Sequence, residues 1–147
     1  MQHWLWRAVD QSGMVLDVLV QSRRDKRAAK RLLRKLLKRQ RRAPRVMITD
    51  TLASYGAAKG EVMPSVEHRR HKGLNNRAEN SHQPIRRRER IMKRFKSMRQ
   101  LQHFVSIHDP VANLFHFPRH NLSSSDHRDL RRTAMATWRQ IYRVAAA

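Results

Sequence analysis

The alternation of apolar and polar positions along residues 4–40 predicts a β-hairpin followed by an amphipathic helix. Residues 4–9 and 14–20 are rich in aromatic and β-branched side chains, which favour strands. Turn-forming residues lie between them at positions 10–13, as expected for a tight antiparallel connection. In residues 25–40 apolar side chains recur every three or four positions, which predicts a helix with one apolar stripe. Ser22 or Asp25 can cap its free amides.

The pattern over residues 45–71 predicts two short strands with a helix between them. Residues 45–49 form a continuous apolar run, typical of a strand that is buried on both faces. Residues 51–59 are expected to form a short helix that Pro64 closes, and residues 65–71 a charged edge strand. The element order indicates a mixed α/β fold in which an antiparallel hairpin lies next to a parallel strand.

The chain after Leu74 is predicted to be mostly helical. Pro84 is expected to kink or restart the helix, because proline has no amide donor, and Pro110 is expected to interrupt it again. Residues 121–127 resemble a linker in which Ser125 or Asp126 can cap a final helix over residues 129–144. We therefore expect a main domain over residues 1–117, followed by a linker and a C-terminal helix over residues 118–147.

The net charge of the chain indicates the class of molecule that it binds. Lys and Arg total 33 against 11 Asp and Glu, giving a net charge of +22 and a pI near 11.9. An excess of this size favours a polyanionic partner, first of all nucleic acid, and a binder without catalysis is the commoner case. The chain has no Cys, which excludes disulfides and cysteine-based zinc sites. No apolar run is long enough to cross a bilayer and no signal peptide is recognised, so a cytoplasmic protein is expected.

Two acids stand out as candidate metal ligands. Asp50 ends the apolar strand, where α/β sheets commonly bind ligands, and Glu79 is a single acid in a strongly basic segment. Metal-assisted phosphoryl transfer needs about three carboxylates, and these two can supply part of such a set. The alternative for Asp50 is a helix N-cap, and the alternative for Glu79 is a surface ion pair with Arg77, Arg86 or Arg87.

Basic residues offer two candidate DNA-binding surfaces. The polar face of helix 25–40 is nearly all Lys and Arg, which suits either a solvated face or phosphate contact. The stronger candidates follow Glu79 and contact phosphates without reading sequence. They are Arg86, Arg87, Arg88, Arg90, Lys93 and Arg94. His82 follows Glu79 by about one helical turn and is either a neighbour of the same site or a structural histidine.

Three segments in order resemble the catalytic region of a DDE-type insertion-sequence transposase of the insertion-sequence-six family. They are Ile48-Thr-Asp50, Val66-Glu-His-Arg69, and Leu74-Asn-Asn-Arg-Ala-Glu79-Asn-Ser-His-Gln-Pro84, which the arginine run follows. The resemblance spans roughly residues 4–117. It implies a ribonuclease H-like mixed sheet flanked by helices, with Asp50 as the second catalytic acid and Glu79 as the third.

The resemblance also implies partners and a cofactor. These are Mg²⁺ or Mn²⁺ held by Asp50 and Glu79, the DNA of the element ends and of the target, and a homo-oligomer. The family's first acid lies on a first strand upstream of the hairpin, and no position in this chain matches it. Asp10 and Asp17 do not take its place. We therefore expect an N-terminally truncated copy that lacks the first strand and is inactive alone.

Two functions follow from these observations. The first is a transposase catalytic domain that cleaves and joins DNA strands with a divalent metal. The second is a non-catalytic basic nucleic-acid-binding protein, which rests on the charge alone. As a member of the first class, the chain is expected to be inactive in this form.

Overall fold

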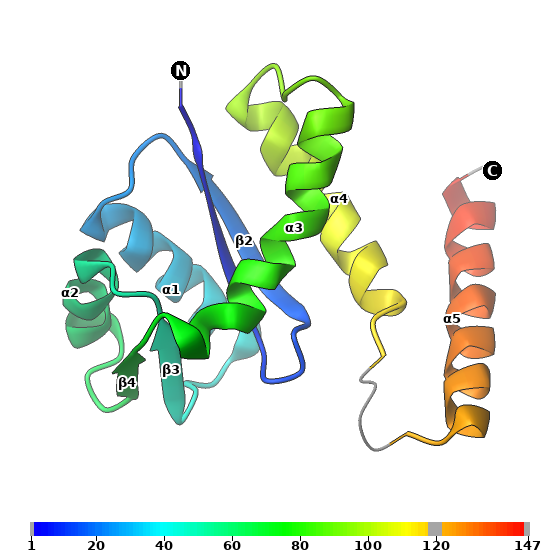
Figure 1. The fold of residues 1–147 in the computed structure, drawn as a ribbon, viewed down its shortest axis with the longest axis horizontal. Helices are drawn as coiled ribbons and strands as arrows, with labels where there is room; N and C mark the ends of the chain where they lie inside the picture. The colour runs from blue at the N-terminus through cyan, green and yellow to red at the C-terminus, as the bar shows by residue number, and fades with distance from the viewer. Residues whose placement is uncertain (1, 118–121, 146–147) are drawn as a thin grey trace. The chain divides into compact units, whose positions relative to one another are not determined.

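The computed structural model describes residues 2–117 and 122–145. These residues belong to two compact units, Met1–Ile107 and His108–Ala147. The first unit holds all the strands of the described chain and both candidate acids (Figure 1). The second unit consists of the end of one helix, a connection and the C-terminal helix.

The N-terminal hairpin forms as predicted. Strand β1 (Trp4–Val9) pairs antiparallel with β2 (Val15–Gln21), with Trp4 opposite Gln21. The turn depends on Asp10, whose carboxylate accepts hydrogen bonds from the backbone amides of Ser12 and Met14. Gly13 has a φ of 88°, in the left-handed region that glycine tolerates without steric cost. The turn residues predicted from the sequence are therefore the residues that close the hairpin.

Helix α1 (Lys26–Gln40) follows and covers the hairpin with its apolar stripe. Asp25 is its N-cap, because the Asp25 carboxylate accepts a 2.9 Å hydrogen bond from the amide of Ala28. Ala28, Ala29, Leu32 and Leu33 are all buried, and their spacing is the one predicted for the apolar face. The helix prediction is confirmed, with Asp25 and not Ser22 as the cap.

A second, smaller pair of strands lies further along the chain. Strand β3 (Val46–Thr49) runs parallel to β4 (Glu67–Arg70), and helix α2 (Ala53–Val62) connects them. The prediction that β3 is buried on both faces is wrong, since Ile48 is 42% exposed. The reason is local: Met47 packs against an apolar cluster on one face of the strand, whereas the neighbouring Ile48 points to the opposite face, which is more exposed.

The predicted mixed sheet is present as two separate two-stranded sheets. No ladder joins the hairpin to the β3–β4 pair within residues 2–117 and 122–145. One apolar cluster connects the elements instead, with Trp6 of β1, Leu32 of α1 and Ala58 of α2 buried together. Trp6 also packs edge-on against Tyr55 of α2, with ring centroids 5.2 Å apart. The α/β class is confirmed, whereas a continuous sheet is not observed.

The helical half of this unit begins directly after β4. A short 3₁₀ turn, η1 (Gly73–Asn75), leads into α3 (Asn76–Ile91), and α4 (Met98–Leu114) follows. Helix α3 packs against β1 (Figure 1). A second apolar cluster joins Val18 of β2, Ile85 of α3 and Val105 of α4. The side chain of Gln102 in α4 also accepts a 2.8 Å hydrogen bond from the backbone amide of Val20.

The predicted restart at Pro84 and the predicted interruption at Pro110 are wrong, since both prolines lie inside continuous helices. Pro84 removes the amide donor for the carbonyl of Asn80, but both residues are exposed, so water can bind that carbonyl. The helical region is instead interrupted at residues 92–97, between α3 and α4. Lys93 and Arg94 there take left-handed φ values of 54° and 80°, and the Arg94 amide closes α3 by donating to the carbonyl of Glu89.

The second unit contains α5 (Ser124–Ala145), which begins five residues earlier than predicted. Ser123 and Asp126 explain the earlier start, because the amide of each donates to the side chain of the other. Residues 118–121 of the predicted linker lie outside the described residues. None of the helices in the described ranges is long and apolar enough to span a membrane.

Candidate functional site

Asp50 lies where the sequence predicts it, directly after the C-terminal end of β3. Both of its carboxylate oxygens have partners. Oδ2 accepts a 2.9 Å hydrogen bond from Nη2 of Arg24, and Oδ1 accepts a 3.1 Å hydrogen bond from the backbone amide of Leu52. The alternative that Asp50 is a helix N-cap is not observed, because the N-cap of α2 is Leu52 and it has no side-chain cap. Burial and the nearby charge of Asp50 also raise the pKa of Tyr55.

Arg24 is the residue at this site that the sequence interpretation missed. It comes from the loop before α1, and its guanidinium lies 5.2 Å from the centre of the Trp4 ring while it pairs with Asp50. The two residues are 26 positions apart. The only signal for Arg24 in the sequence is its place in the Arg23-Arg24-Asp25 segment at the helix start, which gives no indication of its partner.

Glu79 lies in the first turn of α3 and is exposed. The backbone brings this helix start back to the end of β3, because the amide of His71 donates to the carbonyl of Thr49 and η1 follows at once. Figure 1 shows the start of α3 beside the β3–β4 pair. Glu79 makes no ion pair with any described residue, so the alternative of a salt bridge with a neighbouring arginine is not observed.

His68 is hydrogen-bonded within the β3–β4 pair, and His82 is shielded from solvent. Nε2 of His68 lies 2.8 Å from the hydroxyl of Thr49, which ties β4 to β3. Burial and then the charges of Arg70 and Lys59 lower the pKa of His68. His82 is largely buried, and this burial, with the charges of Arg7 and Arg86, lowers its pKa to about 4. His82 is therefore neutral near pH 7 and lies near the hairpin residue Arg7.

The predicted DNA-binding residues lie on α3 and in the break after it. All are exposed, and none forms an ion pair with an acid of the described chain. They are Arg86, Arg87, Arg88, Arg90, Lys93 and Arg94. Cations without acidic partners keep their full charge available for an external anion.

The donor atoms at this end of β3 do not make a complete metal site. Asp50 and Glu79 supply hard oxygen ligands of the kind that Mg²⁺ prefers. However, the guanidinium of Arg24 occupies one Asp50 oxygen, and no group of three His, Cys, Asp or Glu within residues 2–117 and 122–145 can hold a metal. Two carboxylates fit part of a divalent-metal site, and the described residues do not complete it.

The fold and this site define a basic α/β domain with two acids near the end of a short parallel strand pair. The family model of the DDE domain of IS240-type transposases matches residues 1–117, so the chain belongs to the family of DDE insertion-sequence transposases. No curated protein and no solved structure matches it. Membership of this family supports a transposase function, with DNA as the partner and a divalent metal as the family's general cofactor.

Proposed function

We propose that residues 1–117 are a ribonuclease H-like transposase catalytic domain, in which Asp50 and Glu79 are two of the metal-binding carboxylates. The main support is their placement. Asp50 follows β3, and Glu79 lies in the first turn of the helix that starts beside that same strand end. Carboxylates gathered at a strand end are suited to hold divalent ions that act on a phosphodiester.

The arginines of α3 are proposed to hold DNA beside these acids. Arg86 follows Glu79 by seven positions, which is about two turns of the same helix. Arg86 and Glu79 therefore lie on one face of α3, roughly 10 Å apart along its axis. A DNA strand whose phosphates contact this face passes close to both acids, and the contact is independent of base sequence.

The 147-residue chain is proposed to be inactive without a third carboxylate. The carboxylates of the two acids in the hairpin already have partners within the fold. Asp10 binds the turn amides, and the buried Asp17 carboxylate pairs with Lys35 at 2.8 Å. Because neither carboxylate is available to a metal, the pair Asp50 and Glu79 binds divalent ions weakly, and strand transfer by this chain is expected to be undetectable.

A calorimetric titration with Mn²⁺ tests the metal site. Wild type is expected to bind weakly, and Asp50→Asn or Glu79→Gln is expected to reduce the affinity at least tenfold. Glu67→Gln is the matched control, because Glu67 lies at the opposite end of the β3–β4 pair and its carboxylate forms an ion pair with Arg69. Binding that neither site variant changes would contradict the metal site and favour the non-catalytic DNA binder.

The proposed inactivity has its own test. Purified chain is incubated with Mn²⁺ and labelled duplex DNA carrying element ends, and strand joining is measured on a denaturing gel. No joined product is expected. Joined product made by wild type and lost in Asp50→Ala would show that the third carboxylate is not required, and it would overturn the inactivity while supporting the role of Asp50.

A further inference from the structure

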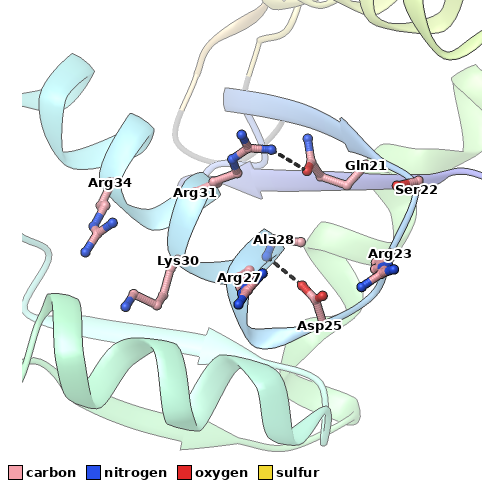
Figure 2. Close-up of a pocket in the computed structure, with 9 residues that line it drawn as sticks. All are labelled: Gln21, Ser22, Arg23, Asp25, Arg27, Ala28, Lys30, Arg31 and Arg34. Carbon is pink, nitrogen blue, oxygen red and sulfur yellow. Dashed lines mark hydrogen bonds between the residues drawn. The ribbon is translucent and has the colours of Figure 1, made fainter.

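A strongly basic pocket is lined in part by residues of the loop that carries Arg24. It has a volume of about 470 Å³ and is formed by the end of β2, the β2–α1 loop and the first turns of α1 (Figure 2). Five cationic side chains line it, with one acid. The cations are Arg23, Arg27, Lys30, Arg31 and Arg34, and the acid is Asp25.

The single acid does not neutralise this pocket. The Asp25 carboxylate is used to cap α1 through the amide of Ala28, as the dashed line in Figure 2 shows. The charge of Lys30 is compensated by an ion pair with Glu61 of α2. Hydrogen bonds with Lys26 and Lys30 lower the pKa of Glu61 to about 2. Arg31 donates to the neutral side chain of Gln21 and keeps its charge.

Three arginines of the pocket have no acidic partner. Arg23, Arg27 and Arg34 are exposed and form no ion pair with a described residue. Like charges that gather without counter-charges repel one another, so the arrangement costs stability unless an external anion binds. Arg27 and Arg34 are two helical turns apart on one face, a separation of roughly 10 Å along the axis.

We propose that this pocket binds the backbone phosphates of duplex DNA, as a contact surface separate from the arginines of α3. The roughly 10 Å between Arg27 and Arg34 allows the two guanidiniums to contact different phosphates, since each strand carries one charge per 3.4 Å of duplex axis. Arginine is well suited to the contact, because its planar guanidinium can donate two hydrogen bonds to one phosphate.

The pocket is linked directly to the candidate acids, and the inference in this respect rests on the proposed function. Arg23 lines the pocket, while its neighbour Arg24 reaches Asp50. DNA that lies along Arg34, Arg27 and Arg23 therefore leads to Asp50. The pocket then supports DNA on the α1 side of the acid, and α3 supports it on the side of Glu79.

The test measures binding of a fluorescein-labelled 30-base-pair duplex of random sequence by anisotropy, in EDTA and over a series of KCl concentrations. The test variant combines Arg23→Gln, Arg27→Gln and Arg34→Gln. The slope of log K against log salt is negative, and each lost phosphate contact reduces its magnitude by about 0.9, so a reduction of roughly 2 to 3 is expected. We also expect affinity at 100 mM KCl to fall at least tenfold.

The matched control combines Arg128→Gln, Arg131→Gln and Arg139→Gln in α5, which removes the same charge from exposed positions. Its affinity is expected to change less than twofold. Equal losses in both variants, or no loss in the pocket variant, would overturn the pocket as a DNA site. A pocket variant that loses binding to duplex RNA but not to DNA would overturn the choice of DNA. Far-ultraviolet circular dichroism and urea unfolding establish that both variants are folded.

Cross-linking gives an independent readout. The chain has no cysteine, so Arg27→Cys provides a unique attachment point for a photoactivatable cross-linker, and Arg131→Cys provides the control. DNA is expected to cross-link at position 27 and not at position 131, and the opposite result would overturn the proposal. These measurements are made in EDTA, so they do not depend on metal binding by Asp50 and Glu79. A failed metal titration therefore leaves this result standing, and the two proposals can fail separately.

Discussion

The two small sheets of this chain differ in how completely they are covered. The outer edge of β2 is closed by side chains, since Gln102 accepts from the Val20 amide and Lys35 donates to the Val18 carbonyl. Helices also pack on the hairpin from two directions. The β3–β4 pair has only four residues in each strand, and Ile48 of β3 is 42% exposed. The hairpin is thus covered by helices and by side-chain hydrogen bonds, whereas part of the β3–β4 pair is exposed.

The candidate site lies at the end of the less covered sheet. Asp50 and the start of α3 lie at the end of the β3–β4 pair, where carboxylates remain within reach of solvent. The acids of the hairpin are used for structure, as the buried Asp17 shows. A carboxylate that must bind an external ion needs an accessible position, and a carboxylate that holds a fold together is best kept from water.

The largest predicted effect comes from the apolar cluster that supports both sheets. Leu32 is fully buried in this cluster, against which Met47 of β3 also packs. Leu32→Ala is expected to lower the free energy of unfolding by about 3 kcal/mol, because it removes buried apolar area and leaves a cavity. Urea unfolding followed by fluorescence and circular dichroism measures the loss. The two signals are expected to coincide, since one cluster supports both sheets.

Leu36→Ala is the control for this prediction. It makes the same change on the same helix at a half-buried position, and about 1 kcal/mol is expected. Equal losses for the two variants would mean that Leu32 has no special place in the core. Separate transitions for the two signals would mean that the two sheets unfold independently of each other.

A smaller effect is expected from the ionic support of the hairpin. Asp17 is buried, accepts from the Val18 amide at 2.8 Å and pairs with Lys35. Asp17→Asn keeps the size of the side chain and removes its charge, and we expect a loss of about 2 kcal/mol. The measurement is the urea midpoint, compared with that of Lys35→Gln, which removes the nearer of two cations that pair with Asp17 and leaves Arg39 at 3.7 Å. A midpoint unchanged in both variants would show that this ion pair does not support the hairpin.

The smallest predicted effect depends on pH. The pKa of His82 is lowered to about 4 by burial and by Arg7 and Arg86, whereas an unfolded histidine titrates near 6.5. Between these values the unfolded state binds the extra proton, so stability is present above pH 6.5 and is lost as the pH falls toward 4. From pH 7 to 5.5 the loss attributable to His82 is about 1 kcal/mol.

The measurement is the difference between wild type and His82→Gln, because carboxylates elsewhere also respond to pH. Wild type is expected to lose about 1 kcal/mol more than the variant between pH 7 and 5.5. Identical pH profiles would show that α3 does not bury this histidine against the hairpin. His82 would then be accessible beside Glu79, as the alternative interpretation of the sequence allows.

The elements that depend on local chemistry were predictable from the sequence. Asp10 and Gly13 specify the hairpin turn, and the apolar spacing of α1 with Asp25 specifies that helix. The errors arose where tertiary context decides. Pro84 is tolerated in an exposed helix face, and the real break at Lys93 and Arg94 has neither proline nor glycine to mark it.

The candidate site was predictable in part for a related reason. The position of Asp50 follows from the end of an apolar strand, which a sequence shows directly. Its ion pair with Arg24 joins residues 26 positions apart and depends on how α1 packs, so no local pattern encodes it. The separation of the two sheets likewise depends on long-range strand pairing, which residue patterns do not specify.

The stacking of Arg24 over Trp4 makes this site optically observable. The guanidinium that lies 5.2 Å from the indole centre is the same group that holds Asp50. A cation that draws Asp50 away from Arg24 changes the electrostatic field at the Trp4 ring, and with it the emission of that indole. Trp4 is thus a built-in fluorescent reporter of this ion pair, and Trp4→Phe identifies its share of the signal among the three tryptophans of the chain.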